Sequence, residues 1–472
     1  MNYYTNIHHA FAQHPLHIAL RWPGQGIGSR WTFGELQQRV ETHRQTLRQK
    51  GVGPGDICLM LIPASAAAIS GILAVMAEGA IPMLPPPGMK WKHWRALHQQ
   101  HKITAYLIAS NSPRAARGLA YWGAGKRIRL DPKVQTNTAM APTEVPDAQP
   151  GLISHSSGST GMPKAIFRTH GVLRSQHAAI NRVFPAWEGQ VDFPLFPNVL
   201  LHNLAVGTQT VMPDLPGFQL TAMDPVVIAR QLAEAQAQTM TGNVYYFRQL
   251  VGYLEAQGQT LNSLRAVGVG GSPVPDALLA RMATCFPEAT IYAIYGSSEA
   301  EPIAVRPFTA PMDPTLGYFA GPIDATLTWR LHEPQTLQAG GQTVQAGELW
   351  VKGPHVVGAE EDRWFKTGDI GYVTEDGLYL TGRIGNETAV ADKMHYQVEH
   401  FLNNLPGITR AAALPRQNQF AIAYEGTLSE QEVLEKLEGI VTLHKINRIV
   451  KSNGLPVDHR HHSKILYRQI RL

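Results

Sequence analysis

The sequence LISHSSGSTGMPK, residues 152–164, decides the fold. An apolar strand end leads into a series of hydroxyl and glycine residues, and Lys164 closes it. Glycines allow several backbone N–H groups to converge on an anion, hydroxyl groups add further donors, and the lysine adds a point charge. The stretch therefore predicts a strand followed by a loop that binds a polyphosphate.

Two other interpretations of this loop fit the residues less well. A flexible Ser/Gly linker rarely ends in Pro–Lys within an apolar frame. A P-loop NTPase requires a glycine at the place where Pro163 stands, five residues after Gly158. A P-loop kinase stays a competing class, which formation of ADP from ATP would establish.

The chain around the loop alternates between helical and strand-like segments. Thr32 and Ser65 stand where they can cap helices, and residues 57–62 and 81–84 are short apolar strands. The same rhythm returns at residues 239–244, 261–269 and 289–295. Strands that alternate with helices are typical of a parallel sheet covered by helices.

The pattern changes after about residue 321, where short strand-like segments are separated by turn residues. Beyond Gly382–Arg383 another unit of helices and strands begins, with a helical stretch at residues 429–437. We therefore expect an α/β fold in which residues 1–383 form a large N-terminal domain of helix-covered sheets. Within it, residues 321–383 form a β-rich subdomain. Residues 384–472 form a small, mobile α+β C-terminal lobe.

Composition excludes several classes of protein. The 472 residues are 44% hydrophobic and 16% charged, which disfavours a disordered chain. The 41 Lys and Arg against 36 Asp and Glu give a net charge of +5 without a block of like charges, so nucleic-acid or membrane-surface binding is not indicated. The most apolar region, residues 58–84, is broken by two prolines and Glu78 and does not predict a membrane span.

The cysteines and the N-terminus indicate the compartment. Cys58 and Cys285 stand beside apolar residues, which predicts two buried, inert thiols and excludes a disulfide framework. The first sixteen residues are polar and lack the apolar stretch of a signal peptide. We expect a soluble, cytoplasmic protein, and the residues favour no particular oligomeric state.

Further motifs follow the loop in a fixed order. They are GGSP (270–273), YGSSE (295–299), GEL (347–349) with Gly353–Pro354, TGD (367–369), Gly382–Arg383 and the segment 456–464. Together with residues 156–164, this series resembles the motifs of the adenylate-forming (AMP-binding) superfamily, which includes acyl-CoA synthetases, luciferases and the adenylation domains of peptide synthetases. The resemblance runs from about Trp31 to the C-terminus.

This resemblance implies an enzyme that uses ATP and Mg²⁺ to convert a small-molecule carboxylic acid into an acyl-adenylate and pyrophosphate. It implies that the catalytic residues are Lys464, Glu299 and Ser298, the last of which replaces the family's threonine. The resemblance also implies a set of nucleotide-binding residues, namely Ser156, Ser157, Gly158, Ser159, Thr160, Gly161, Lys164, Gly271, Ser272, Tyr295, Gly296, Asp369 and Arg383.

Each implied role has a physical basis. Glu299 would hold Mg²⁺ through a carboxylate oxygen, Tyr295 would offer a flat face to adenine, and Asp369 would accept hydrogen bonds from both ribose hydroxyls. Arg383 would reach the ribose or a phosphate. Lys464 would bridge the acid's carboxylate and the α-phosphate as charge shifts in the transition state. Outside the family context, the same residues would be read as solvated, turn or core side chains.

Some positions depart from the family's pattern. Ala165 follows the loop lysine where a glycine is usual, and Gly385 occupies the hinge, where it should ease rotation of the lobe. The glycine-containing loop that approaches the pantetheine arm in thioester formers is not recognisable in residues 387–398. Use of CoA therefore stays open.

A narrower resemblance concerns the second half of the reaction. Residues 87–89, 193–197, 211–214 and 456–464 resemble the OleC branch, the β-lactone synthetases of olefin biosynthesis. Those enzymes adenylate a 2-alkyl-3-hydroxy acid whose own hydroxyl then closes the ring. The alternatives are an acyl-CoA synthetase or acyl-AMP ligase that forms a thioester, and a non-catalytic nucleotide-binding protein.

The apolar stretch at residues 195–206 is the candidate lining of the acid pocket. Phe196 and His202 are its candidate contacts with the acid. The competing interpretation of His202 is a core histidine whose nitrogens are satisfied within the protein.

Overall fold

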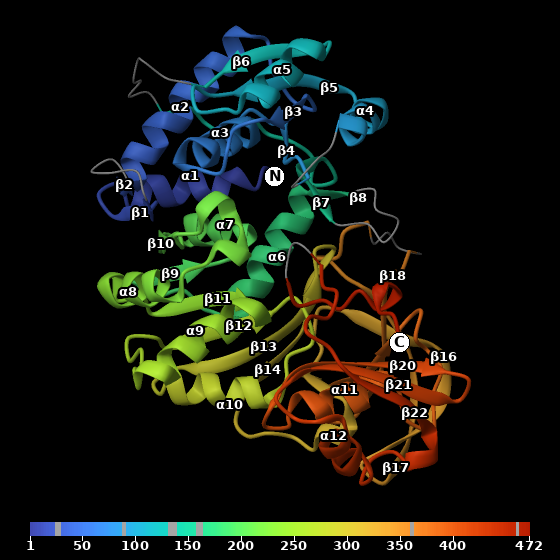
Figure 1. Ribbon diagram of the computed structural model, residues 1–472. Coiled ribbons are helices and arrows are strands. Elements are labelled where there is room, and N and C mark those ends of the chain that lie inside the picture. Colours follow the sequence, from blue (N-terminus) through green and yellow to red (C-terminus); the bar gives the residue numbers. More distant parts are fainter. Residues whose placement is uncertain (24–29, 87–90, 131–138, 157–163, 359–362, 459–461) are drawn as a thin grey trace. The chain divides into compact units, whose positions relative to one another are not determined.

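The computed structural model describes residues 1–23, 30–86, 91–130, 139–156, 164–358, 363–458 and 462–472 (Figure 1). The chain divides into two compact units. The first comprises Met1–Gln219 and Ala237–Thr239, and the second comprises Leu220–Gln236 and Met240–Leu472. Over the described residues, none of the helices combines the length and apolar character that crossing a bilayer requires.

The first unit contains the elements α1 to α7 and β1 to β10. Its helices are α1 (Tyr4–Gln13), α2 (Phe33–Gln49), α3 (Ala66–Ala77), α4 (Trp91–Gln100), α5 (Arg114–Trp122), α6 (His170–Val183) and α7 (Pro197–Val206). Its strands are β1 (Ile18–Arg21), β2 (Arg30–Thr32), β3 (Ile57–Met60), β4 (Ile81–Met83), β5 (Ile103–Ile108), β6 (Lys126–Arg129), β7 (Pro150–Ser156), β8 (Lys164–Thr169), β9 (Val191–Pro194) and β10 (Gln209–Val211).

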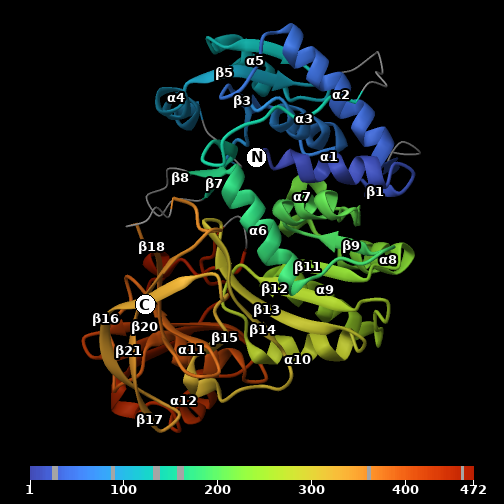
Figure 2. The ribbon, with the colours of Figure 1, turned by 180° about the vertical axis from the view of Figure 1, so that it is seen from behind.

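These strands form the predicted helix-covered sheets. One sheet has the order β6-β5-β3-β4-β7-β8, parallel except for the antiparallel pair β7 and β8 that flanks the glycine-rich loop. The strands β9, β10, β1 and β2 pair in that order. Helices α1, α2 and α3 pack against one another beside them (Figure 2).

Local signals in the sequence set the ends of two helices as expected. Thr32 Oγ1 accepts the Glu35 N–H at 3.1 Å, and the Glu35 carboxylate accepts the Thr32 N–H at 2.8 Å. This reciprocal arrangement is a capping box, which satisfies backbone donors that have no partner within the helix. Ser65 caps α3 through the Ala68 N–H. Both predicted helix starts are confirmed.

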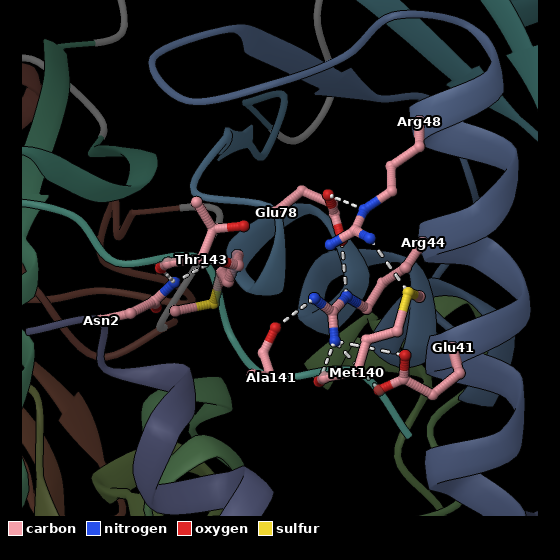
Figure 3. A network of polar contacts seen from close by, with 9 residues as sticks. Asn2, Glu41, Arg44, Arg48, Glu78, Met140, Ala141 and Thr143 are labelled. Carbon is pink, nitrogen blue, oxygen red and sulfur yellow. Dashed lines mark hydrogen bonds and ion pairs between the residues drawn. The ribbon is translucent and has the colours of Figure 1, made fainter. Parts of the chain in front are cut away.

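A buried ion-pair network joins the first unit's helices to the segment before β7 (Figure 3). Arg44 is fully buried, and its Nε donates to Glu78 at 2.6 Å while Nη1 donates to Glu41 at 3.1 Å. Its remaining donors reach the carbonyl groups of Met140 and Ala141, at 2.5 and 2.8 Å. Because every charge has a partner, the network holds the chain that leads to β7 without leaving a bare buried ion.

The second unit begins at Leu220, and it includes β11 (Thr239–Asn243) apart from that strand's first residue. Its other strands are β12 (Ala266–Gly270), β13 (Thr290–Ser297), β14 (Ala300–Pro307), β15 (Tyr318–Gly321), β16 (Thr328–Ala339), β17 (Gln342–Lys352), β18 (Phe365–Val373), β19 (Leu378–Arg383), β20 (Ile408–Arg416), β21 (Gln419–Gly426) and β22 (Ile446–Lys451). Its helices are α8 (Pro225–Ala235), α9 (Val244–Gln257), α10 (Asp276–Cys285), α11 (His395–Asn403) and α12 (Glu430–Leu437).

The strands of the second unit form three groups. Strands β14, β13, β12 and β11 pair in that order, and β15-β19-β18-β17-β16 form an antiparallel sheet. Strands β20-β21-β22 form a mixed sheet, in which β20 and β21 are antiparallel and β21 and β22 are parallel. The antiparallel sheet covers the region in which β-rich structure is expected. The proposed boundary of the small lobe at residue 384 stays a prediction, since the two compact units meet elsewhere in the sequence.

Both cysteines are buried, as predicted. Cys58 lies in β3 with none of its surface exposed, and Cys285 ends α10 with 2% exposed. Burial raises the pKa of the Cys58 thiol to about 12. Since a thiolate is the reactive form, both thiols are inert in the folded protein.

Candidate active site

Three of the predicted nucleotide-binding residues meet in the second unit. The Tyr295 hydroxyl donates to Asp369 Oδ2 at 2.9 Å, and Arg383 Nη1 donates to Asp369 Oδ1 at 2.8 Å. The Asp369 residue is only 8% exposed. Each carboxylate oxygen keeps a lone pair, because an ionised carboxylate can accept about four hydrogen bonds.

The electrostatics of this trio keep Arg383 and Tyr295 protonated. The negative charge of the Asp369 carboxylate raises the pKa of the Arg383 guanidinium above its usual value, and this effect outweighs burial, which lowers the pKa. Burial raises the pKa of the Tyr295 hydroxyl well above 10. At neutral pH, Tyr295 therefore stays a hydrogen-bond donor and Arg383 stays a cation.

The parallel pair β12 and β13 places the GGSP turn beside Tyr295. Gly270 and Ile294 are register partners, so both strands end at the same edge of the sheet. A Cβ at Gly270 would lie 2.6 Å from the Ile294 carbonyl oxygen, which explains the glycine. Gly271 has a φ of +82°, which favours glycine. Among the described residues, no hydrogen-bond partner reaches the buried Ser272 Oγ.

The TGD motif lies within β18, at an irregularity in its pairing with β17, and presents Asp369. Gly368 has a φ of +73°, and its N–H donates to Glu348 Oε1 at 3.2 Å. The Thr367 hydroxyl donates to the Leu349 carbonyl at 2.8 Å and accepts the Asp369 N–H at 3.1 Å. Glu348 belongs to the GEL motif, so that motif supports this part of β18 through its carboxylate. The hydrogen bond between the Glu348 side chain and Gly368 could not be predicted from the spacing of the motifs in the sequence.

The proposed catalytic pair Ser298 and Glu299 occupies the turn between β13 and β14. The Val357 N–H donates to the Glu299 carbonyl at 2.7 Å, which fixes the backbone of this turn. Gly296 lets the chain before the turn pass close to the chain after it, because a Cβ at this position would lie only 2.8 Å from the Ala300 carbonyl oxygen. The metal-binding role of Glu299 stays a prediction.

Lys464 lies near the C-terminus on a turn closed by backbone contacts. Its N–H donates to Asp458 Oδ1 at 3.1 Å, and its carbonyl accepts the Asp458 N–H at 2.9 Å. Val457 and Ile465 form a β-bridge on either side. The side chain of Lys464 is exposed.

Most of the glycine-rich loop lies outside the described residues, namely Ser157, Gly158, Ser159, Thr160 and Gly161. Its flanks are described at the backbone, where Ser156 in β7 pairs with Lys164 in β8. Lys164 is exposed. The predicted strand before the loop is therefore confirmed, the strand β8 after it was not predicted, and the phosphate contacts of the loop stay predictions.

The candidate acid-pocket residues lie in the first unit. Phe196 precedes α7 and is half-buried, whereas His202 within α7 is 4% exposed. His202 Nδ1 lies 2.9 Å from His177 Nδ1 in α6, so one imidazole donates and the other accepts. Burial, reinforced by His177, lowers the pKa of His202 to about 3. This geometry supports the core interpretation, and a contact of His202 with the acid stays a prediction.

One functional candidate was not anticipated from the sequence. His395 Nε2 accepts the backbone N–H of Arg383 at 2.9 Å, which ties the last residue of β19 to the first residue of α11. The signal available in the sequence was the spacing of His395 and Glu399, which places both on one face of a helix.

The chain matches the AMP-binding enzyme family over residues 7–358 and belongs to that family. It is therefore an enzyme of the acid-activating, AMP-forming class.

Two curated relatives and one solved structure illustrate the relationship. The chain is 25% identical to the olefin β-lactone synthetase of Xanthomonas campestris pv. campestris, covering 96% of this chain and 94% of the relative. It is 26% identical to 4-coumarate–CoA ligase-like 6 of Oryza sativa subsp. japonica, covering 86% and 76%. O-succinylbenzoate coenzyme A synthetase of Bacillus subtilis, solved with AMP, has the same fold, with a TM-score of 0.77, 18% identity and coverage of 100% and 98%. That enzyme has also been solved with ATP and a magnesium ion.

Proposed function

We propose that this enzyme adenylates a 3-hydroxy carboxylic acid with ATP and then closes it to a β-lactone. The observation that carries the first step is the buried Asp369 carboxylate, held between Tyr295 and Arg383 with lone pairs to spare. A ribose diol offers two hydroxyl donors to such a group.

The residues present fit a nucleotide with its metal. The buried Ser272 hydroxyl, without a partner among the described residues, lies in the turn beside Tyr295 and offers a polar contact for a bound base. Mg²⁺ prefers one or two protein carboxylates together with phosphate oxygens, and Glu299 is the carboxylate we assign to it. When bound, Mg²⁺ neutralises charge on the phosphates.

The chemistry of the first step follows from these assignments. A carboxylate oxygen of the acid attacks the α-phosphorus, and the bond to the bridging oxygen of pyrophosphate breaks. Lys464 stabilises the negative charge that is shared between the carboxylate and the α-phosphate, and this stabilisation is strongest in the transition state.

In the second step, the acid's own 3-hydroxyl oxygen attacks the acyl carbon. The acyl–phosphate bond breaks, AMP leaves with the electron pair, and the hydroxyl proton passes to the AMP phosphate or to water. Because nucleophile and electrophile belong to one molecule, the enzyme has only to hold them in reach and exclude water.

Two observations favour ring closure over transfer to CoA. The β-lactone synthetase relative is aligned over 96% of this chain and 94% of its own length. Residues 387–398 lack the glycine-containing loop of thioester formers. A thioester-forming acyl-CoA synthetase is the second candidate, and the CoA ligase-like relative is the observation that favours it.

The test is mass spectrometry of the products from a 3-hydroxy acid and from the matched plain fatty acid, each with ATP and Mg²⁺, with and without CoA. We expect pyrophosphate release and loss of one water from the 3-hydroxy acid, independent of CoA. A thioester from the plain acid would overturn ring closure and leave adenylation standing. ATP binding without pyrophosphate release from any acid would favour a non-catalytic nucleotide-binding protein, and ADP would indicate a kinase.

A further inference from the structure

A continuous series of buried and part-buried hydrogen bonds leads from Arg383 to the C-terminal segment. The Arg383 N–H donates to His395 Nε2 at 2.9 Å, and His395 Nδ1 lies 3.1 Å from Glu399 Oε1. The Tyr467 hydroxyl donates to the other carboxylate oxygen, Glu399 Oε2, at 2.8 Å. Tyr467 stands three residues after Lys464 in the chain.

The direction of each hydrogen bond is fixed by the groups involved. A backbone N–H can only donate, so His395 Nε2 must accept and carry no proton. The proton of the neutral imidazole is then on Nδ1, which donates to Glu399. Rotation or protonation of this ring would break at least one of the two contacts.

Glu399 is the centre of this arrangement. His395 is fully buried and Glu399 is 2% exposed. Besides His395 and Tyr467, the Ala413 N–H donates to Glu399 Oε1 at 2.9 Å. A buried carboxylate that loses one of its donors has no water to replace it, so the position of each donor is tightly determined.

The segment that carries Lys464 is joined to this centre by its own backbone. The hydrogen bond from the Lys464 N–H to Asp458 and the bridge between Val457 and Ile465 fix the backbone on both sides of Lys464. Tyr467 then ties this segment to Glu399. At the other end of the series, the Arg383 side chain binds Asp369.

We propose that His395, Glu399 and Tyr467 are positioning residues. They hold Lys464 at a fixed position relative to the Asp369–Arg383 pair. The proposal rests on the adenylation function, because it assigns these residues an effect through Lys464. They do not touch the substrate, and their contribution is to the rate of adenylation and not to nucleotide affinity.

The decisive variant is Tyr467→Phe, which removes only the hydroxyl that binds Glu399. We expect the kcat for pyrophosphate release to fall about tenfold, as for loss of a hydrogen bond to a buried charge, with the KM for ATP changed less than twofold. The matched control is Tyr424→Phe in the same part of the chain, where a buried tyrosine hydroxyl donates to the Leu428 carbonyl at 2.9 Å. The control should leave kcat unchanged.

Two further measurements separate positioning from a general loss of structure. In a Lys464→Ala background, Tyr467→Phe should cause no additional loss of kcat, since its effect passes through the lysine. Deuterium exchange of peptides covering residues 462–472 should become faster in Tyr467→Phe and not in Tyr424→Phe. This second readout needs no catalytic activity.

The outcomes distinguish this proposal from the proposed function. If the wild-type enzyme releases no pyrophosphate with any acid, the function fails, whatever the variants do. If the wild type is active while Tyr467→Phe keeps its kcat and its exchange rate, the positioning role is wrong and adenylation stands. A rise in KM for ATP that equals the fall in kcat/KM would also overturn it.

Discussion

Asp369 and Arg383 are direct register partners on the antiparallel strands β18 and β19, and their side chains form a 2.8 Å ion pair on one face of the sheet. The adjacent ladder pair, Ile370 and Gly382, holds the two residues opposite each other, so their side chains meet without ordering a loop. The carboxylate that we assign to the ribose is thus supported by regular structure.

The first prediction concerns this carboxylate. Asp369→Asn should raise the KM for ATP about 10- to 100-fold, because a neutral amide loses the charge-assisted contacts that a carboxylate makes. Steady-state kinetics with varied ATP measure this change. A variant with unchanged KM and a lowered kcat would show that Asp369 acts on the chemical step.

The second prediction concerns Lys464. Lys464→Ala should lower kcat for adenylation about 10²- to 10³-fold, because the lysine acts on charge that develops in the transition state. ATP affinity, measured by calorimetry, should change little. Loss of ATP affinity with an unchanged kcat would contradict the assigned role.

The third prediction concerns Glu299. Glu299→Gln keeps the size of the side chain and removes the charge that favours a divalent cation. The Mg²⁺ concentration needed for half-maximal pyrophosphate release should rise, with recovery of activity at high Mg²⁺. The same Mg²⁺ dependence in variant and wild type would remove Glu299 from the metal site.

The fourth prediction concerns stability. Arg44→Met leaves Glu41 and Glu78 in a buried site without this cation, which should lower the free energy of unfolding by about 3–5 kcal/mol. The control is Arg265→Met, whose 3.6 Å pair with Glu288 is more than half exposed on both sides and should cost less than about 1 kcal/mol. Equal urea midpoints for both variants would refute the difference.

The fifth prediction concerns pH. Unfolded histidines bind a proton near pH 6.5, whereas folded His202 stays neutral down to about pH 3. The unfolded chain therefore binds more protons in this range, and stability falls as pH falls, by up to about 1.4 kcal/mol per pH unit for this proton.

His202→Phe should flatten this dependence between pH 7.5 and 5, as measured by urea unfolding. The exposed His444 is the control, and His444→Gln should leave the slope unchanged. Parallel curves for His202→Phe and the wild type would show that His202 does not contribute to the acid sensitivity.

Local signals predicted elements where they act over a few residues. Thr32 and Ser65 cap the expected helices, and β3 begins at the expected residue. The strand expected at residues 261–269 begins only at Ala266, because Asn262 and Ser263 form a turn. Propensity for turns outweighed the apolar pattern there.

Helix α11 could not be recognised from apolar periodicity. Its buried positions include His395, Gln397, Glu399 and His400, all 2% exposed or less. Polar residues are buried there because each contact is supplied by distant parts of the chain, such as the Thr315 carbonyl that accepts from Gln397 at 2.9 Å. The same reason applies to the site: motifs identified Tyr295, Asp369 and Arg383, but the contact with His395 depends on tertiary structure.

The two buried thiols have a consequence for how unfolding can be followed. Cys58 lies in the first compact unit and Cys285 in the second. A thiol reagent can modify each cysteine only after its surroundings open, so the two modification rates, read by peptide mass mapping, report the opening of the two units separately. The chain thus carries one native kinetic probe in each half, with no label to introduce.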